Sequence, residues 1–228
     1  MDLVQFFQSC KTLDERLRTI RKRLPYSDED NRKHVFGVLR SQLIWYEVIL
    51  NIFGVKYGKR VSDDVFKSIF GIKIDEDKQW LEFQVIAKNS VITFWNFIIE
   101  NFFKTLLISL DASKDPPTGY YRITTEVFDK IPSIRNKAQK IDILNALAMT
   151  RNSFHNNGVY APVPPAPESK MIDIDGTIFN FVKGQPTKIS EPQMVLLLSK
   201  IAEALNEIVL SNEVQQLQSV PQVFVPRF

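Results

Sequence analysis

Apolar side chains recur along the start of the chain in alternating steps of three and four residues. They are Leu3, Phe6, Cys10, Leu13, Leu17, Ile20 and Leu24. Positions spaced in this way lie on one side of an α-helix, so the pattern predicts an amphipathic helix that ends before Pro25. A second helix is predicted from Ser27 or Asp28 to Gly54. Its buried side is expected to carry Val35, Leu39, Leu43, Tyr46 and Leu50.

The remaining helical patterns fall into five segments. A short one is bounded by Ser62 and Gly71, and the longest runs from "DEDKQW" to Leu110. The others are "TEVFDKI" before Pro132, the segment 133–158, and the strongly apolar segment 190–217. Gly158 is expected to end the fourth of these, since glycine readily adopts the left-handed conformation found after helices. Ser190 is expected to cap the last segment.

One stretch instead alternates with a period of two. In "MIDIDGTIFNFVKG" the apolar and polar residues alternate on both sides of Asp175 and Gly176, which predicts a β-hairpin over 171–183 that follows a proline-rich linker. The expected fold class is mainly α, a helical bundle with a small β-hairpin between the last two helices. We expect a single domain over 1–228, with an N-terminal helical portion (1–74), a core (75–213) and an extended tail (219–228).

Composition narrows the class of protein. A hydrophobic fraction of 44% excludes a disordered chain, and a net charge of +3 does not by itself indicate a polyanion partner. The lone Cys10 and the lack of a secretory signal favour a cytoplasmic location. The apolar stretch "VITFWNFIIENFFKTLLISL" contains Asn96, Glu100, Asn101 and Lys104. It is therefore expected to be a core helix, and no membrane span is predicted.

Positive charge is concentrated in "RLRTIRKRL". This segment contains Arg16, Arg18, Arg21, Lys22 and Arg23 and no acidic residue. The charges lie off the apolar seam of the first helix. This side of the helix is consistent with three roles: a solvated face, a face that binds RNA phosphates, or a dimer seam. Association with an anionic membrane surface is a weaker alternative.

Several familiar sites are missing from the sequence. There is no phosphate-binding glycine loop, and "DIDG" lacks the further acids of a calcium loop. Two histidines and one cysteine show no zinc-binding spacing, so no metal site and no cofactor are predicted. His34 is expected to be an ordinary surface histidine.

The segment "MTRNSFHNNGVY" contains the strongest candidate chemistry. Arg151 and His155 are four residues apart, so on an α-helix their side chains project from the same side, in the direction of the apolar residues Leu144 and Ala148. Asn152 flanks the pair and Asn156 follows one turn later. A purely structural explanation is also open, because a histidine at a helix C-terminus can bind the last carbonyl groups.

An arginine and a histidine placed together suit metal-independent cleavage of RNA. The imidazole can take a proton from a ribose 2′-hydroxyl or give one to the leaving 5′-oxygen, while the guanidinium stabilises charge on the phosphorane. Because one histidine does not easily perform both proton transfers, a two-fold dimer that joins two such helix ends would supply the second.

These residues, together with the proline-rich linker, the hairpin and the closing apolar helix, resemble the HEPN superfamily of helical domains from prokaryotic toxin, antiviral and RNA-processing systems. The resemblance covers about the last half of the chain and is specific around 149–158. It implies a bundle that dimerises through its motif helices and, in active members, an endoribonuclease. Arg151 and His155 correspond to the motif residues, and Asn152 matches the polar residue that follows the motif arginine.

The motif departs from the family in its spacing. Three residues separate Arg151 from His155, at least one fewer than is usual. Family members with altered motifs bind RNA or a protein partner without cutting, so a catalytically inactive interaction module is the alternative function. As partners the resemblance implies RNA, a second copy of the chain, and an antitoxin or a nucleotidyltransferase.

Overall fold

The fold is mainly helical and carries one hairpin, as the sequence predicts. A computed structural model describes residues 3–52 and 76–222; the predicted helix 62–71 and the last tail residues, 223–228, lie outside the described residues. The elements in order are α1 (Leu3–Arg23), α2 (Asn31–Ile52), α4 (Glu76–Leu110), α5 (Tyr120–Lys130), α6 (Lys137–His155), β1 (Ser169–Ile174), β2 (Thr177–Val182), α7 (Glu191–Val209) and α8 (Asn212–Gln215).

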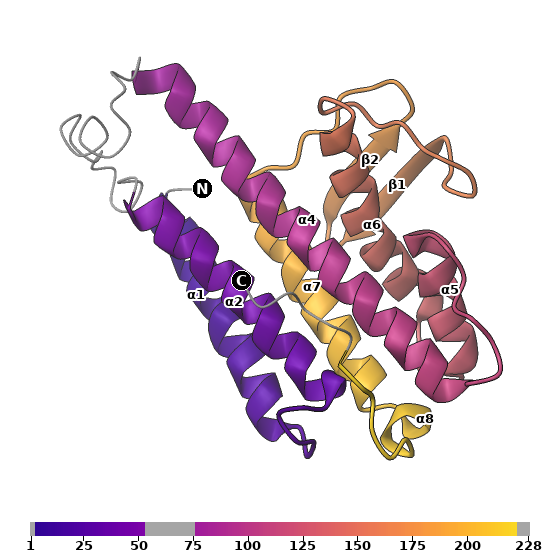
Figure 1. The fold of residues 1–228 in the computed structure, drawn as a ribbon. Helices are drawn as coiled ribbons and strands as arrows, with labels where there is room; N and C mark the ends of the chain where they lie inside the picture. Colours follow the sequence, from indigo (N-terminus) through magenta and orange to yellow (C-terminus); the bar gives the residue numbers. More distant parts are fainter. Residues whose placement is uncertain (1–2, 53–75, 223–228) are drawn as a thin grey trace.

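Helix α4 runs through the middle of the bundle (Figure 1). The pair α1 and α2 lies on one side of it, the pair α5 and α6 lies on the other, and α7 passes behind it. The hairpin packs against α6, and an ion pair between Lys170 and Asp142 (2.9 Å) joins the two elements. The buried apolar side chains form one connected core that extends from Phe6 to Val220.

The apolar seam of α1 is confirmed where side chains are described. Five of its members, Phe6, Cys10, Leu13, Leu17 and Leu24, are buried, and Ile20 packs against the core from its edge. In α2 the predicted positions Val35, Leu39, Leu43 and Tyr46 are buried. The side chains of Leu3 and Leu50 lie outside the described set.

Four predicted helix boundaries were wrong, and one of them is the start of α6, which begins at Lys137 and not at Ser133. Helix α2 begins at Asn31 because Asp30 caps it, accepting a hydrogen bond from the backbone N–H of Arg32 (2.9 Å). Helix α5 already begins at Tyr120, immediately after Gly119. The segment 190–217 forms two helices, since Ser211 has an extended backbone (φ −67°, ψ 151°) between α7 and α8. The predicted cap of α7 is confirmed, with Ser190 Oγ accepting from the backbone N–H of Gln193.

The hairpin follows the predicted register. Ile172 lies opposite Phe179, and Asp175 and Gly176 form the two-residue turn with φ of 51° and 79°. Both residues of such a turn need positive φ, which Asp tolerates and Gly adopts freely. Alternate side chains on one face, Ile172, Ile174, Phe179 and Phe181, are buried.

Helix α4 is long and apolar enough within Gln84–Leu110 to cross a membrane by length and composition alone. In the bundle, 56% of the most apolar part of this stretch is buried. The expectation that it serves as a core helix and not as a membrane span stays a prediction.

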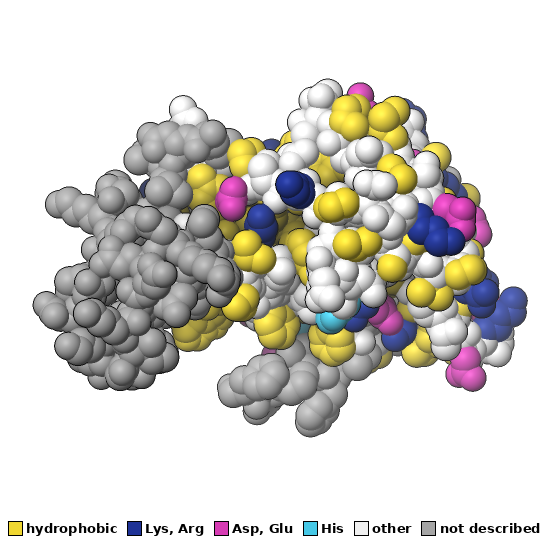
Figure 2. Space-filling view, turned by 90° about the horizontal axis from the view of Figure 1, so that it is seen from above, with side chains coloured by type: hydrophobic (Ala, Val, Ile, Leu, Met, Phe, Trp, Pro, Cys, Tyr) yellow, Lys and Arg dark blue, Asp and Glu magenta, His cyan; other side chains and the backbone are white. Residues whose placement is uncertain are grey.

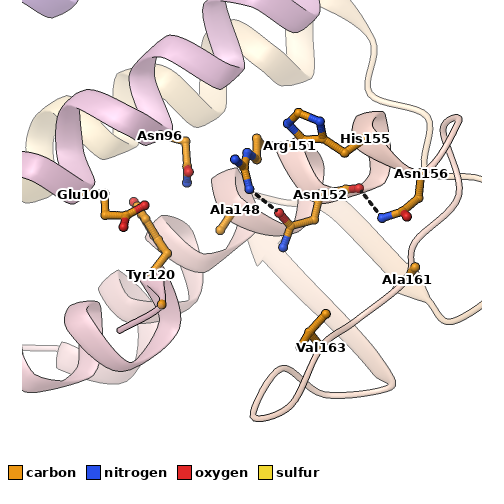
Figure 3. Close-up of a pocket in the computed structure, with 11 residues that line it drawn as sticks. Asn96, Glu100, Tyr120, Ala148, Arg151, Asn152, His155, Asn156, Ala161 and Val163 are labelled. Carbon is orange, nitrogen blue, oxygen red and sulfur yellow. Dashed lines mark hydrogen bonds between the residues drawn. The ribbon is translucent and has the colours of Figure 1, made fainter. Parts of the chain in front are cut away.

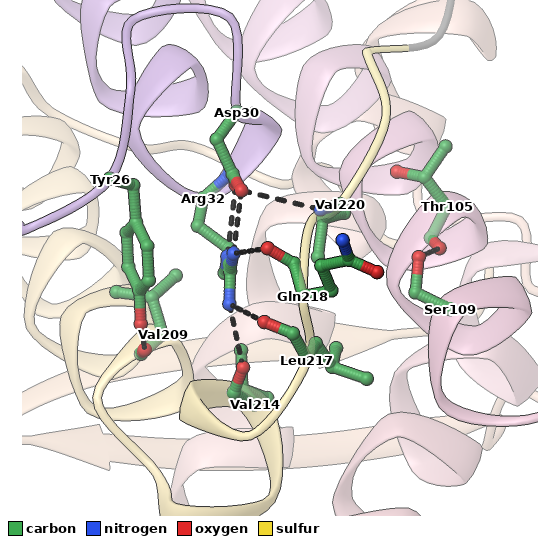
Figure 4. Close-up of polar contacts among 10 residues, drawn as sticks. All are labelled: Tyr26, Asp30, Arg32, Thr105, Ser109, Val209, Val214, Leu217, Gln218 and Val220. Atoms are coloured by element: carbon green, nitrogen blue, oxygen red, sulfur yellow. Dashed lines mark hydrogen bonds and ion pairs between the residues drawn. The ribbon is translucent and has the colours of Figure 1, made fainter.

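A buried ion pair closes one end of the bundle (Figure 4). Arg32, whose exposed fraction is 2%, donates to Asp30 Oδ2 (2.6 Å) and to the carbonyl oxygens of Val214 (2.8 Å) and Leu217 (2.9 Å). Burial alone would raise the pKa of Asp30, but the hydrogen bonds from Arg32 outweigh it and hold that pKa below its usual value. The start of α2 is thereby tied to the chain after α7.

The first part of the tail is ordered by the same cluster. The backbone N–H of Val220 donates to Asp30 Oδ2 (3.3 Å), and its carbonyl accepts from the N–H of Asn31 (2.9 Å). The Val220 side chain is fully buried. The tail therefore docks at least as far as Val220.

Replacing Arg32 with alanine should lower the free energy of unfolding by about 3–5 kcal/mol, because the Asp30 carboxylate would stay buried without its partner. Urea denaturation measures this loss. The exposed Arg18 of α1 offers a matched control, and Arg18→Ala should change the value by no more than about 0.5 kcal/mol. Equal urea midpoints for the two variants would contradict the role given to the ion pair.

Candidate functional site

The C-terminal end of α6 is fixed by backbone contacts. The helix ends at His155, and Asn157 and Gly158 follow with φ of 55° and 82°. The N–H of Gly158 donates to the carbonyl of Ser153 (2.8 Å), which confirms the predicted stop. The hydroxyl groups of Ser153 and Thr187 form a hydrogen bond (3.0 Å) that joins this helix end to the segment that leads into α7.

The motif side chains face a cavity of about 410 Å³ between α4 and α6 (Figure 3). We call it the motif cavity. It is lined by Asn96, Glu100, Gly119, Tyr120, Ala148, Arg151, Asn152, His155, Asn156, Ala161 and Val163. Four elements therefore contribute to it, namely α4, the start of α5, α6 and the loop after α6. The structure brings Arg151 and His155 together as lining residues of one concave site.

Arg151 and His155 lie at the edge of the buried face of α6. Their spacing had suggested that both side chains point toward the core. The fully buried positions of this helix include Leu144, Leu147 and Ser153, whereas Arg151 is half-buried and His155 is exposed. The reason is that the side of α6 carrying Ala148 and Arg151 borders the motif cavity instead of a neighbouring helix. Both groups are thus open to a ligand.

Arg151 keeps most of its donors free. Its Nη1 donates to Asn152 Oδ1 (3.0 Å), and its Nε is buried without a hydrogen-bond partner. In the described ranges 3–52 and 76–222 it forms no ion pair, and Glu100, on the same cavity, pairs with Lys104 (2.6 Å). The guanidinium charge is therefore not neutralised by a contacting carboxylate.

The capping explanation applies to Asn156 and not to His155. Asn156 Nδ2 donates to the carbonyl of Asn152 (2.8 Å), one of the last carbonyl groups of α6. Among the described residues His155 makes no hydrogen bond and no ion pair. Its imidazole is therefore available, while the Asn156 amide, a predicted RNA contact, already has a structural partner.

Two further donors of the motif cavity were not identified from the sequence. Asn96 Nδ2 and the Tyr120 hydroxyl are buried and have no hydrogen-bond partner, like Arg151 Nε. Burial, and to a smaller extent the charge of Glu100, raises the pKa of Tyr120, so its hydroxyl stays protonated as a donor. A signal was present, because Asn96 and Glu100 interrupt an apolar helix with a spacing of four residues.

Unpaired buried donors are uncommon because each costs free energy on folding. Here three of them, one of which belongs to Arg151, come from residues that line one concave site. Such a set of donors is complementary to an oxyanion, whose oxygens would accept the missing hydrogen bonds.

None of the basic residues of α1 lines the motif cavity. Arg16 contacts Ser199 and Glu203 in the middle of α7. Arg21 is close enough to His34 to influence its pKa, and His34 lines a cavity that Arg151 also borders.

Two of the basic side chains are already engaged. Arg16 pairs with Glu203, and Arg21 pairs with Asp28 (3.0 Å). Arg18, Lys22 and Arg23 are exposed. The end of the molecule seen in Figure 2 carries Lys and Arg in small separate groups and no continuous basic band. Phosphate contacts by this segment stay a prediction, and none of its residues lines the motif cavity.

His34 is half-buried and is not a free surface histidine as expected. It lines a second cavity of about 400 Å³ between α2 and α4, to which Phe94, Phe97 and Arg151 also contribute. Burial, followed by the charge of Arg21, lowers its pKa. Arg151 thus lies between two cavities.

Tyr120→Phe should raise the free energy of unfolding by about 1 kcal/mol, because it removes a buried hydroxyl that has no partner. Tyr160→Phe is the matched control. The Tyr160 hydroxyl donates to the carbonyl of Pro167 (2.8 Å), so its removal should lower stability by about 1 kcal/mol. Thermal and urea unfolding measure both changes. Destabilisation by Tyr120→Phe would indicate that its hydroxyl has a structural role.

Within the residues that the structure describes, no three His, Cys, Asp or Glu side chains gather in an arrangement that could hold a metal ion. Comparison with protein-family models, curated proteins and solved structures finds no match to this chain.

Proposed function

We propose that this protein is a HEPN-like endoribonuclease of a toxin–antitoxin or defence system, which cuts RNA without a metal ion and acts in the cytoplasm. The observation that carries the proposal is the motif cavity, because Arg151, Asn96 and Tyr120, each with a buried unpaired donor, line it together with His155. A phosphodiester provides the oxygen acceptors that these donors lack.

In the proposed reaction the imidazole of His155 removes the proton from a ribose 2′-hydroxyl. The 2′-oxygen then attacks the neighbouring phosphorus, and the bond to the 5′-oxygen breaks. The leaving oxygen takes up a proton, and a 2′,3′-cyclic phosphate remains on the other fragment. Arg151, Asn96 and Tyr120 would stabilise the charge that develops on the phosphorane oxygens.

A second copy of the chain would supply the second proton-transfer group. Two aromatic residues of α4, Phe94 and Phe97, are 42% and 51% exposed and line the cavity between α2 and α4 that Arg151 also borders. Exposed aromatic side chains beside a polar site are typical of interfaces. A homodimer that covers them would place a second His155 near the first site.

The alternative proposal is a catalytically inactive module that binds RNA or a protein, such as an antitoxin or a nucleotidyltransferase. It is favoured by the short Arg151–His155 spacing and by the hydrogen bond that occupies Nη1 of Arg151 with Asn152. Under this proposal the same donors hold a ligand that is not cleaved.

The purified protein should cut single-stranded RNA in the presence of EDTA and leave 2′,3′-cyclic phosphate ends. His155→Ala should lower the rate by at least about 100-fold, because the proton transfer is lost. Arg151→Ala should have a similar effect. Rates are measured on end-labelled RNA, and product ends by their resistance to phosphatase before acid treatment.

Thr12→Ala is the control, since it changes an exposed residue of α1 that lines neither the motif cavity nor the cavity between α2 and α4. It should cut RNA at the wild-type rate. Cutting by His155→Ala at that rate would reject the catalytic proposal. Binding of RNA without any cutting, weakened by Arg151→Ala, would instead support the inactive module.

Phe97→Asp should convert a dimer into a monomer, because it places a charge within the proposed apolar contact. Sedimentation velocity measures the change. Ile108→Asp is a matched control on the same helix, with 45% exposure and outside both cavities, and it should leave the dimer intact. A wild-type protein that sediments as a monomer at micromolar concentration would refute the dimer.

A further inference from the structure

A third cavity adjoins the motif cavity on the side of the proline-rich loop. We call it the loop cavity. It has a volume of about 340 Å³ and is bordered by Tyr121, Arg122, Asn145, Asn152, Tyr160 and the loop 162–166. Gly119, Tyr120, Ala148, Asn152 and Val163 line both this cavity and the motif cavity, so the two spaces are adjacent. A ligand anchored in one can extend into the other.

Asn145 is the unusual residue of the loop cavity. Its exposed fraction is 1%, yet both its amide oxygen and its amide nitrogen lack a hydrogen-bond partner. Other buried polar side chains of α6 are satisfied locally: Thr150 donates to the carbonyl of Ala146 (2.7 Å), and Ser153 to that of Met149 (2.8 Å). Because a buried amide with both ends unpaired is costly, its position on a cavity wall indicates a ligand with one donor and one acceptor side by side.

The walls of the loop cavity favour a flat aromatic ligand. Two tyrosines, Tyr121 and Tyr160, and the exposed Arg122 are among the residues that line the cavity. The loop itself is held in place, because the N–H of Tyr160 donates to the carbonyl of Gln185 (3.0 Å) and its hydroxyl to Pro167. Aromatic walls and a fixed polar amide are the usual features of sites that bind an unstacked base.

We propose that the loop cavity binds a nucleobase of the RNA substrate next to the cleaved phosphate, with the Asn145 amide hydrogen-bonded to the base edge. This inference rests on the proposed function of the motif cavity and adds a source of sequence preference to it. The amide can pair with any base edge that carries an adjacent donor and acceptor. Asn152 lines both cavities and would therefore lie between the bound base and the bound phosphate.

The test uses dinucleotides whose 5′ nucleoside lacks the 2′-hydroxyl, so that they bind without being cut. Each of the four bases is placed on either side of the phosphate, and affinities are measured by calorimetry. The wild-type chain should prefer one base, and Asn145→Leu should weaken that ligand by about 10-fold or more and remove the preference. The matching mononucleotide should bind more weakly than the dinucleotide, since it fills one cavity only.

Thr150→Val is the matched control, because it removes another buried polar group of α6 that does not border a cavity. It should keep the base preference. The midpoint temperature of thermal unfolding of Asn145→Leu should equal or exceed that of the wild type. A loss of binding in this variant would then not be caused by a loss of folding. Unchanged affinities in Asn145→Leu would overturn the base site, and equal affinity for mononucleotide and dinucleotide would overturn its assignment to an RNA chain.

The two proposals fail separately. If the wild-type protein cuts no RNA but Asn145→Leu loses the base preference, catalysis is refuted and the base site stands. If the protein cuts RNA and Asn145→Leu cuts with the same rate and sequence preference, the base site is refuted and catalysis stands. His155→Ala should bind the dinucleotides with unchanged preference, because the imidazole borders the motif cavity and not the loop cavity.

Discussion

Polar groups that leave water on folding must find hydrogen-bond partners inside the protein, or their desolvation lowers its stability. At one end of this bundle the requirement is met. Arg32 and Asp30 are almost fully buried and are hydrogen-bonded to each other. Arg32 also donates to two carbonyl groups after α7, and Asp30 accepts from the backbone N–H of Val220. This network connects the start of α2 to the chain after α7 and thereby closes the bundle.

Around the motif cavity and the loop cavity the same requirement is not met. Asn96, Tyr120, Asn145 and Arg151 come from three helices, and each keeps at least one buried atom without a partner. Together they border two adjacent cavities with volumes of about 410 and 340 Å³. Unpaired polar groups that gather around cavities in this way are expected where a ligand completes the hydrogen bonds, and this contrast is the basis of both functional proposals.

The arrangement also explains how the chemistry could be divided. The motif cavity presents donors and an imidazole, which suits a phosphate and its proton transfers, whereas the loop cavity presents an amide and tyrosine rings, which suits a base. The basic residues of α1 line neither cavity. In this proposal, binding in one copy of the chain depends on a few directed contacts.

Local sequence determined the elements and several of their details. The period of the apolar residues predicted the helices, and Asp175–Gly176 predicted a hairpin turn because both positions tolerate positive φ. The four-residue spacing also placed Arg151 and His155 on one side of α6. Helix boundaries were less certain, since Asp30 begins α2 through a cap that the apolar pattern does not reveal.

Only the tertiary structure decided which polar residues share a site. Asn96 and Tyr120 are separated from Arg151 by 55 and 31 positions in the sequence, and they meet it because α4, α5 and α6 pack around one gap. The exposure of His155 likewise depends on what lies opposite α6, which its own sequence does not specify. Periodicity reports which side of a helix is apolar, whereas the packing of helices determines whether a polar side chain faces solvent, a neighbouring helix or a cavity.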